Sequence, residues 1–134
     1  MSQNPEVDLL DPTHAVVAAR AAAEKGATDI VVLRVGDVLA ITDYFVIVSA
    51  SNPRLVRAVA GDIEEAVVRS GGPKPVRIEG LTECEWVLID FGTFVAHVFH
   101  TETRSYYELE RLWSDVPSVD WVDPDSPLQV EAAG

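Results

Sequence analysis

Apolar positions recur along the chain with two different periods, and these periods predict where helices and strands lie. A spacing of four, which puts side chains on one buried stripe of a helix, relates Leu55, Val59, Ile63 and Val67. This helix is predicted to begin after Asn52-Pro53 and to end before Gly71-Gly72. Asp11-Pro12 and Gly26 are the same kinds of start and stop signal, so an earlier helix is predicted between them.

Runs rich in β-branched residues predict strands at residues 30–35, 44–49 and 76–78. The run at residues 44–49, Tyr-Phe-Val-Ile-Val-Ser, is apolar at consecutive positions instead of alternate ones. A strand of this kind needs cover on both of its faces. It is therefore predicted to lie in the interior of a sheet.

Two further apolar runs, residues 86–91 and 94–99, flank Gly92-Thr93, which suits the two-residue loop of a β-hairpin. Counting outward from this loop pairs Val87 with Val98. The same face also carries Ile89, Phe91, Phe94 and Ala96. Because that face is wholly apolar, it is predicted to belong to the core.

The other face of the hairpin combines aromatic rings with a carboxylate and an imidazole: Trp86, Leu88, Asp90, Val95, His97 and Phe99. Two interpretations compete for it. In the first, a helix covers the face, and Asp90 and His97 are hydrogen-bonded at its rim. In the second, the face binds a protein partner, because aromatic residues are enriched in interface cores. The pattern alone favours the first interpretation.

A last helix is predicted over residues 102–113, and the element order becomes α-β-β-α-β-β-β-α. This order predicts an α/β (α+β) fold, with a mixed sheet of about five strands flanked by helices. On the last helix, Tyr106, Leu109 and Trp113 share one face and are expected to pack inward. Tyr107, Glu110 and Arg111 lie off that face and are available to a partner.

Composition narrows the kinds of partner. The 134-residue chain has 48% hydrophobic residues and a net charge of −12, and its single cysteine, Cys84, forms no disulfide framework. The two ends of the chain hold eight of the 22 acidic residues and no basic residue. The remaining body is still mildly acidic, and no Lys/Arg stripe is present to neutralise phosphates. Direct nucleic-acid binding is therefore not expected, whereas a basic protein partner fits.

The ends of the chain also lack periodicity. Residues 1–10 are expected to be a flexible N-terminal tail, and residues 115–134 an acidic, Pro-containing flexible tail, which leaves one domain at residues 11–114. A chain truncated after Ser114 is accordingly expected to fold and to bind. No signal-peptide pattern or membrane-length apolar run is found, so a soluble, cytoplasmic protein with no membrane contact is expected.

Two long segments resemble signatures of the ribosomal silencing factor family, RsfS or Iojap. The first is Ile-Thr-Asp-Tyr-Phe-Val-Ile-Val-Ser at residues 41–49. The second runs from Glu-Trp at residues 85–86 through Asp-Phe-Gly and His-Val-Phe to Tyr-Glu-Leu-Glu-Arg-Leu-Trp at residues 107–113. The similarity spans about residues 12–115, and Thr93 departs from it, since many members carry an acidic residue there.

The resemblance implies a function. Members bind the large ribosomal subunit through its ribosomal protein fourteen, block joining of the small subunit and so repress translation, notably when nutrients are short. The resemblance also implies a homodimer and a nucleotidyltransferase-like topology. An assembly factor for the large subunit that docks on the same surface remains an alternative, because both roles need the same contact.

Carried onto this chain, the family's partner surface implies a set of binding residues. These are Trp86, Leu88, Asp90, His97 and Phe99 from the sheet, with Tyr107 and Glu110 from the last helix. This set coincides with the second face of the hairpin and shifts the interpretation there from core toward interface.

Nucleotidyl transfer is the enzymatic rival that the fold kinship raises. It needs a Gly-Ser turn and a D-x-D carboxylate pair with a third acid for two metal ions. The chain has no Gly-Ser dipeptide, and its only D-x-D is Asp123-Pro124-Asp125 in the predicted tail. His97 and His100 point to opposite faces of a strand and cannot chelate one metal ion. No catalytic activity, metal or cofactor is therefore expected.

Overall fold

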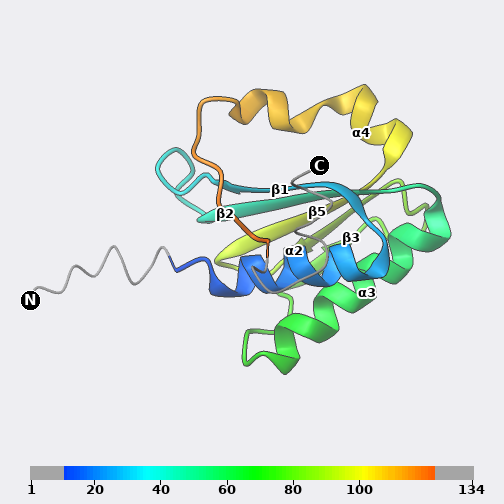
Figure 1. Ribbon diagram of the computed structural model, residues 1–134, viewed down its shortest axis with the longest axis horizontal. Coiled ribbons are helices and arrows are strands. Elements are labelled where there is room, and N and C mark those ends of the chain that lie inside the picture. Colours follow the sequence, from blue (N-terminus) through cyan, green and yellow to red (C-terminus); the bar gives the residue numbers. More distant parts are fainter. Residues whose placement is uncertain (1–10, 123–134) are drawn as a thin grey trace, which may run out of the picture.

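The structure is a computed structural model in which residues 11–122 are described (Figure 1). It contains one five-stranded sheet with helices on both faces, in the order β1-β2-β5-β4-β3. The strands are β1 (Thr28–Arg34), β2 (Tyr44–Ala50), β3 (Arg77–Glu79), β4 (Trp86–Asp90) and β5 (Phe94–His100). The helices are α2 (Thr13–Lys25), α3 (Pro53–Arg69), α4 (Thr101–Tyr107) and the 3₁₀ helix η1 (Leu109–Trp113). This arrangement confirms the predicted fold class and element order.

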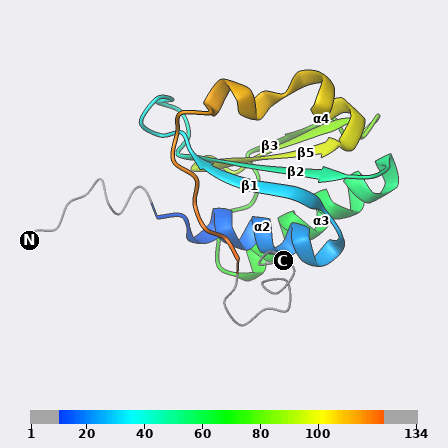
Figure 2. The same ribbon diagram turned by 45° about the horizontal axis from the view of Figure 1, so that its top comes forward.

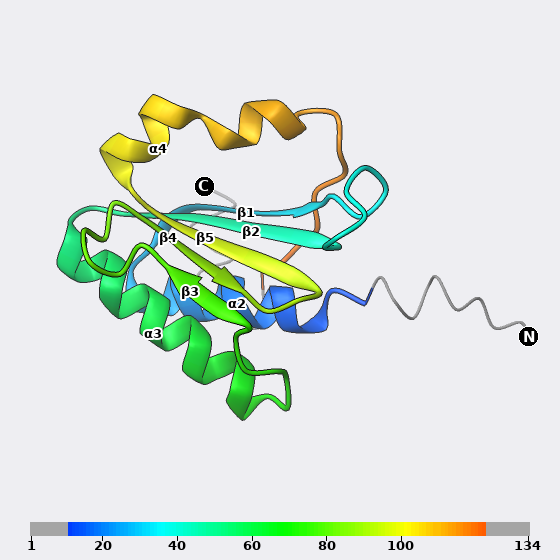
Figure 3. The ribbon, with the colours of Figure 1, turned by 180° about the vertical axis from the view of Figure 1, so that it is seen from behind.

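The sheet is mixed because β2 and β5 run parallel, while the other neighbouring strands are antiparallel. Every residue of β2 is buried, as the unbroken apolar run at residues 44–49 predicts. Strands β1 and β3 form the two edges of the sheet, which are seen from behind in Figure 3. The interior position of β2 therefore follows from its lack of a polar face.

The hairpin of β4 and β5 has the predicted register. Val87 pairs with Val98, and Trp86 at the start of β4 pairs with Phe99. The Phe91 N–H donates to the Phe94 carbonyl at 2.9 Å and closes the loop at Gly92-Thr93. The apolar face of this hairpin packs against α2 and α3, so the prediction that it is core is confirmed.

A second, smaller core lies on the opposite face of the sheet, beneath α4 and η1 (Figure 2). Its buried members are Leu33, Val35, Phe45, Ile47 and Phe99. Leu109 and Trp113 of η1 pack on it, as the last predicted helix requires. Both faces of the central strands are therefore covered.

The last helix differs from the prediction, because it is two short helices instead of one. Helix α4 ends at Tyr107, and Glu108 adopts a left-handed backbone with φ of 50° before η1 begins. This break changes which side chains face inward. Tyr106, predicted to pack inward with Leu109 and Trp113, is 81% exposed.

The segment after η1 also differs from the prediction of a tail that begins at residue 115. Residues 115–122 return past β1 toward α2 (Figure 2). Val119 N–H donates to the Val32 carbonyl at 2.8 Å, and Arg34 N–H donates to the Pro117 carbonyl at 2.9 Å. Trp121 packs on the main core. The packed domain thus continues past residue 114, whereas the predicted tail at residues 1–10 and residues 123–134 lie outside the described residues.

Candidate protein-interaction surface

Trp86 is the centre of an aromatic cluster on the face of the sheet under α4. Its ring lies 4.7 Å from the ring of Phe99 and 5.2 Å from that of Tyr107, centroid to centroid. The indole Nε1–H donates to Nδ1 of His97 at 3.1 Å. The Nε1 edge of the indole is thereby hydrogen-bonded to a buried side chain, while Trp86 as a whole is half-buried and partly open to solvent.

His97 is a buried part of this cluster. Burial lowers the pKa of its imidazole to about 4, because desolvation disfavours the charged ring. Since Nδ1 accepts from Trp86, the neutral ring carries its proton on Nε2. No hydrogen-bond partner for Nε2 is found among the described residues. The buried His97 ring therefore orients the Trp86 indole through this hydrogen bond and stays uncharged at neutral pH.

Two of the residues expected at the partner surface are not at the surface. Phe99 is 0% exposed, and His97 is 5% exposed. The chain turns directly from β5 into α4 and folds back over the sheet, so the aromatic face of the hairpin becomes core beneath α4 and η1. For these two side chains the first interpretation, in which a helix covers the face, is thus correct. Their expected role as direct contacts to a protein partner is wrong for this arrangement of the chain.

The remaining expected residues lie in different places. Leu88 and Asp90 are half-buried along β4, and Asp90 accepts a hydrogen bond from Gly92 N–H at 2.8 Å, which stabilises the hairpin turn. Tyr107 is 54% exposed beside Trp86. Glu110 is half-buried and pairs with Arg104 at 3.2 Å, beside Ser49. The structure therefore brings Trp86 and Tyr107 together and leaves Glu110 in a separate ion pair.

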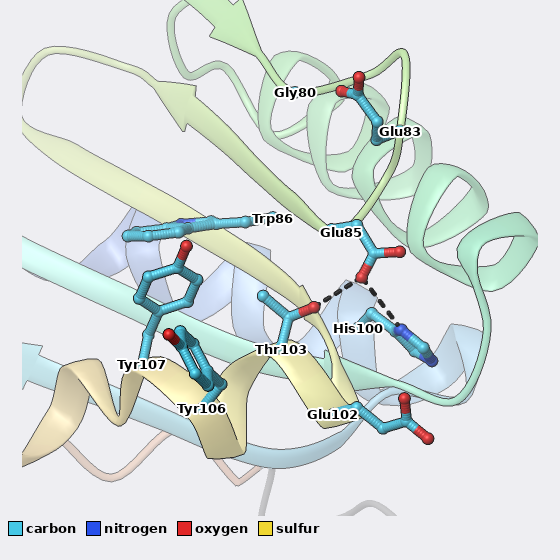
Figure 4. A pocket seen from close by; sticks show the side chains of 9 residues that line it. All are labelled: Gly80, Glu83, Glu85, Trp86, His100, Glu102, Thr103, Tyr106 and Tyr107. Carbon is cyan, nitrogen blue, oxygen red and sulfur yellow. Dashed lines mark hydrogen bonds and ion pairs between the residues drawn. The ribbon is translucent and has the colours of Figure 1, made fainter.

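A groove opens beside Trp86 and combines residues that lie far apart in the sequence (Figure 4). We call it the aromatic–acidic groove; its lining residues are Gly80, Glu83, Glu85, Trp86, His100, Glu102, Thr103, Tyr106 and Tyr107. Tyr106 and Tyr107 project from α4 toward it, and the loop between β3 and β4 forms the facing side. Most of these residues were missed by the sequence reasoning, because no periodic pattern links the loop to α4.

Glu85 is the best-positioned carboxylate of this groove. It accepts a hydrogen bond from the Thr103 hydroxyl at 2.6 Å, and its other contact is with His100 Nδ1 at 3.3 Å (Figure 4). The Thr103 hydrogen bond, followed by the His100 contact, lowers the pKa of the Glu85 carboxyl. The groove therefore keeps a negative charge near its centre at neutral pH.

Gly80 allows the loop to pass close to the start of β4. Its φ is +95°, and a Cβ at this position would lie 2.1 Å from the Trp86 carbonyl oxygen. A residue with a side chain would therefore push the loop away from Trp86. Glycine at this position therefore lets the loop between β3 and β4 pack closely against the start of β4.

Within residues 11–122, no group of three or more His, Cys, Asp or Glu side chains is placed to hold a metal ion. Asp123-Pro124-Asp125 lies outside the described residues. Cys84 is buried, and its thiol contacts the Leu81 carbonyl at 3.1 Å. In the same part of the chain, no helix has the length and apolar character needed to cross a bilayer.

Comparison with known proteins adds independent evidence. Residues 10–133 match the family model described as ribosomal silencing factor during starvation (RsfS). The ribosomal silencing factor RsfS of Bacillus subtilis is 39% identical over 104 residues, covering 78% of this chain and 87% of that protein. The mouse protein named mitochondrial assembly of ribosomal large subunit protein 1 is 36% identical over 93 residues, covering 68% of this chain and 41% of that protein.

Solved structures agree with these sequence relationships. A crystal structure of a Bacillus halodurans protein superimposes with a TM-score of 0.70 at 34% identity, covering 82% of this chain and 99% of that one. The family match spans both signature segments and the residues that line the aromatic–acidic groove. The chain therefore belongs to the ribosomal silencing factor family, RsfS.

Proposed function

We propose that this protein binds the large ribosomal subunit through ribosomal protein fourteen and sterically blocks joining of the small subunit, in the cytoplasm. The observation that carries this proposal is an exposed aromatic surface on a member of the RsfS family: Tyr106 and Tyr107 on α4, beside the half-buried Trp86. Tyr and Trp provide large contact areas at low conformational-entropy cost and are common anchors of interfaces.

Charge supports a basic partner. The chain has a net charge of −12, and Glu83, Glu85 and Glu102 line the same groove as the exposed aromatic rings. Opposite charges raise the rate of encounter with a basic surface such as those that ribosomal proteins present. The acidic rim therefore favours approach, and the aromatic residues supply the buried contact.

The proposed mechanism needs only affinity and bulk, without a catalytic step or a cofactor. A standard interface buries about 800 Å² on each partner, and the described domain would then fill space that the small subunit must occupy. The bound factor stabilises the separated large subunit by mass action, so the degree of repression depends on its concentration relative to Kd.

A subunit-joining assay tests this proposal. Light scattering follows association of purified bacterial subunits with and without the protein, and binding to isolated ribosomal protein fourteen is measured alongside. We expect wild-type protein to reduce joining, and Tyr106→Ala/Tyr107→Ala to bind more weakly by about 2 kcal/mol, because the aromatic anchors are lost.

The matched control is Val68→Ala, an exposed apolar side chain on α3, on the opposite face of the sheet. This variant should inhibit like wild type. Unimpeded joining at saturating wild-type protein would refute steric blocking, and full activity of the double tyrosine variant would remove α4 from the interface.

A second candidate function is assembly of the large subunit, the role named for the mouse relative. The same surface would serve both roles. Sucrose-gradient profiles of cells that lack the protein distinguish the two roles. Accumulated large-subunit precursors would indicate assembly, whereas subunits that stay joined during starvation would indicate silencing.

A further inference from the structure

We propose that the aromatic–acidic groove receives a cationic side chain of the protein partner, with an arginine guanidinium as the best fit. The proposal deepens the proposed function, since it names the chemistry by which the same surface recognises a basic partner. The groove itself is defined by side chains of this chain alone, so its chemistry is testable without a ribosome.

The walls of the groove have the geometry of a cation–π site. Tyr106 and Tyr107 pack edge to face with centroids 5.0 Å apart, and Tyr107 lies 5.2 Å from Trp86. The two tyrosines are 81% and 54% exposed, so ring surface is open to solvent. A cation within about 6 Å of such rings is attracted by their negative faces, most strongly at Trp.

Three carboxylates add negative charge to the groove, and two of them have no basic partner within the described part of the chain. Glu83, Glu85 and Glu102 line the groove, and among residues 11–122 no Lys or Arg lines it with them. The Glu85 carboxylate contacts Thr103 and His100. Glu83 and Glu102 take part in none of the ion pairs found among residues 11–122. A cation entering the groove would therefore meet uncompensated negative charge.

The combination of rings and carboxylates selects among possible occupants. Nucleobases also stack on aromatic rings, but their phosphates would be repelled by three carboxylates. A purely apolar side chain would leave the carboxylates partly desolvated without a partner. Arginine satisfies both halves of the groove, because its planar guanidinium stacks on rings and donates paired hydrogen bonds to carboxylates.

Nuclear magnetic resonance of the full chain tests the proposal directly, with N-acetyl-arginine amide as the probe. We expect the indole N–H signal of Trp86 and the amide signals of Glu85 and Glu102 to shift on titration. N-acetyl-citrulline amide, which keeps the shape and removes the charge, should give shifts at least tenfold smaller at the same concentration. Equal shifts with both probes, or shifts with adenosine monophosphate and none with the arginine probe, would overturn the proposal.

Two variants with the same change in net charge sharpen the test. Glu83→Gln/Glu102→Gln removes groove charge while keeping side-chain size, and Glu24→Gln/Glu65→Gln does the same on helices α2 and α3. The groove variant should lose the arginine-induced shifts, and the control should keep them. Retention of the shifts in the groove variant would place the cation elsewhere and refute the site.

Binding to purified large subunits separates this inference from the proposed function. The groove variant should bind about tenfold more weakly than the control, with a smaller dependence of Kd on salt. Arginine-induced shifts in a protein that does not bind large subunits would refute the proposed function alone. Subunit binding that is equal in the two variants would refute the role of the groove in recognition.

Discussion

At the scale of single residues, burial of His97 links the stability of the fold to pH. The pKa of its ring is lowered to about 4 from an ordinary value of 6.5, so the unfolded chain binds a proton there at a higher pH than the native chain does. Protonation thus favours the unfolded state between these two values. The free energy of unfolding should fall as pH decreases through this window, by up to about 1.4 kcal/mol per pH unit from this group.

Urea denaturation of wild type and His97→Gln between pH 7 and about pH 4.5 measures this contribution. Glutamine can still accept from the Trp86 indole and does not titrate, so the variant should show a shallower pH dependence even if it is less stable overall. Identical slopes for wild type and His97→Gln would contradict the assignment.

At the scale of elements, the segment at residues 115–122 stabilises the edge of the sheet. Besides the two backbone hydrogen bonds to β1, Trp121 donates from Nε1 to the Ile30 carbonyl at 3.2 Å, and its own carbonyl accepts from Arg20 at 2.7 Å. Val116 and Val119 pack on the two cores. This segment ties β1 to α2 and covers an edge that would otherwise present unpaired backbone groups.

Truncation after Ser114 is therefore expected to destabilise the domain, in contrast to the expectation from the sequence. Loss of four hydrogen bonds and the packing of Trp121 should lower the free energy of unfolding by several kcal/mol, on the order of 3. Urea denaturation compares this chain with one ending at Val122, which retains the segment. Equal midpoints for the two chains would show that the segment adds nothing to stability.

At the scale of the whole molecule, two exposed apolar side chains provide a candidate surface for the homodimer that the family resemblance implies. Val38 and Ile41, in the loop between β1 and β2, are 66% and 83% exposed. Because the aromatic rings of α4 are proposed to bind the ribosomal partner, a second copy would need another surface. Burying these two side chains would remove apolar area from water on both copies.

Light scattering coupled to size exclusion measures the predicted dimer. Wild type should have twice the mass of one chain, and Ile41→Asp should shift the population toward monomer, because a buried unpaired carboxylate is costly. Val68→Asp on α3 should remain dimeric. A monomeric wild type at high concentration would contradict the homodimer, and an unchanged mass for Ile41→Asp would exclude this loop from the interface.

The sequence by itself determined the structural features that depend only on residues close together in the chain. The register of the β4–β5 hairpin followed from a two-residue loop and a period of two, and the interior place of β2 followed from its unbroken apolar run. Both features are local because the backbone geometry repeats residue by residue. The family signatures likewise lie in these continuous segments.

Only the tertiary structure decided which element covers the aromatic face of the hairpin. The left-handed residue Glu108 splits the last helix, brings η1 over Phe99 and His97, and leaves Tyr106 outside. The aromatic–acidic groove joins the β3–β4 loop to α4, and the segment at residues 115–122 pairs with β1 far back in the chain. Periodicity identifies an apolar face but not the element that covers it, because that choice depends on contacts between residues distant in sequence.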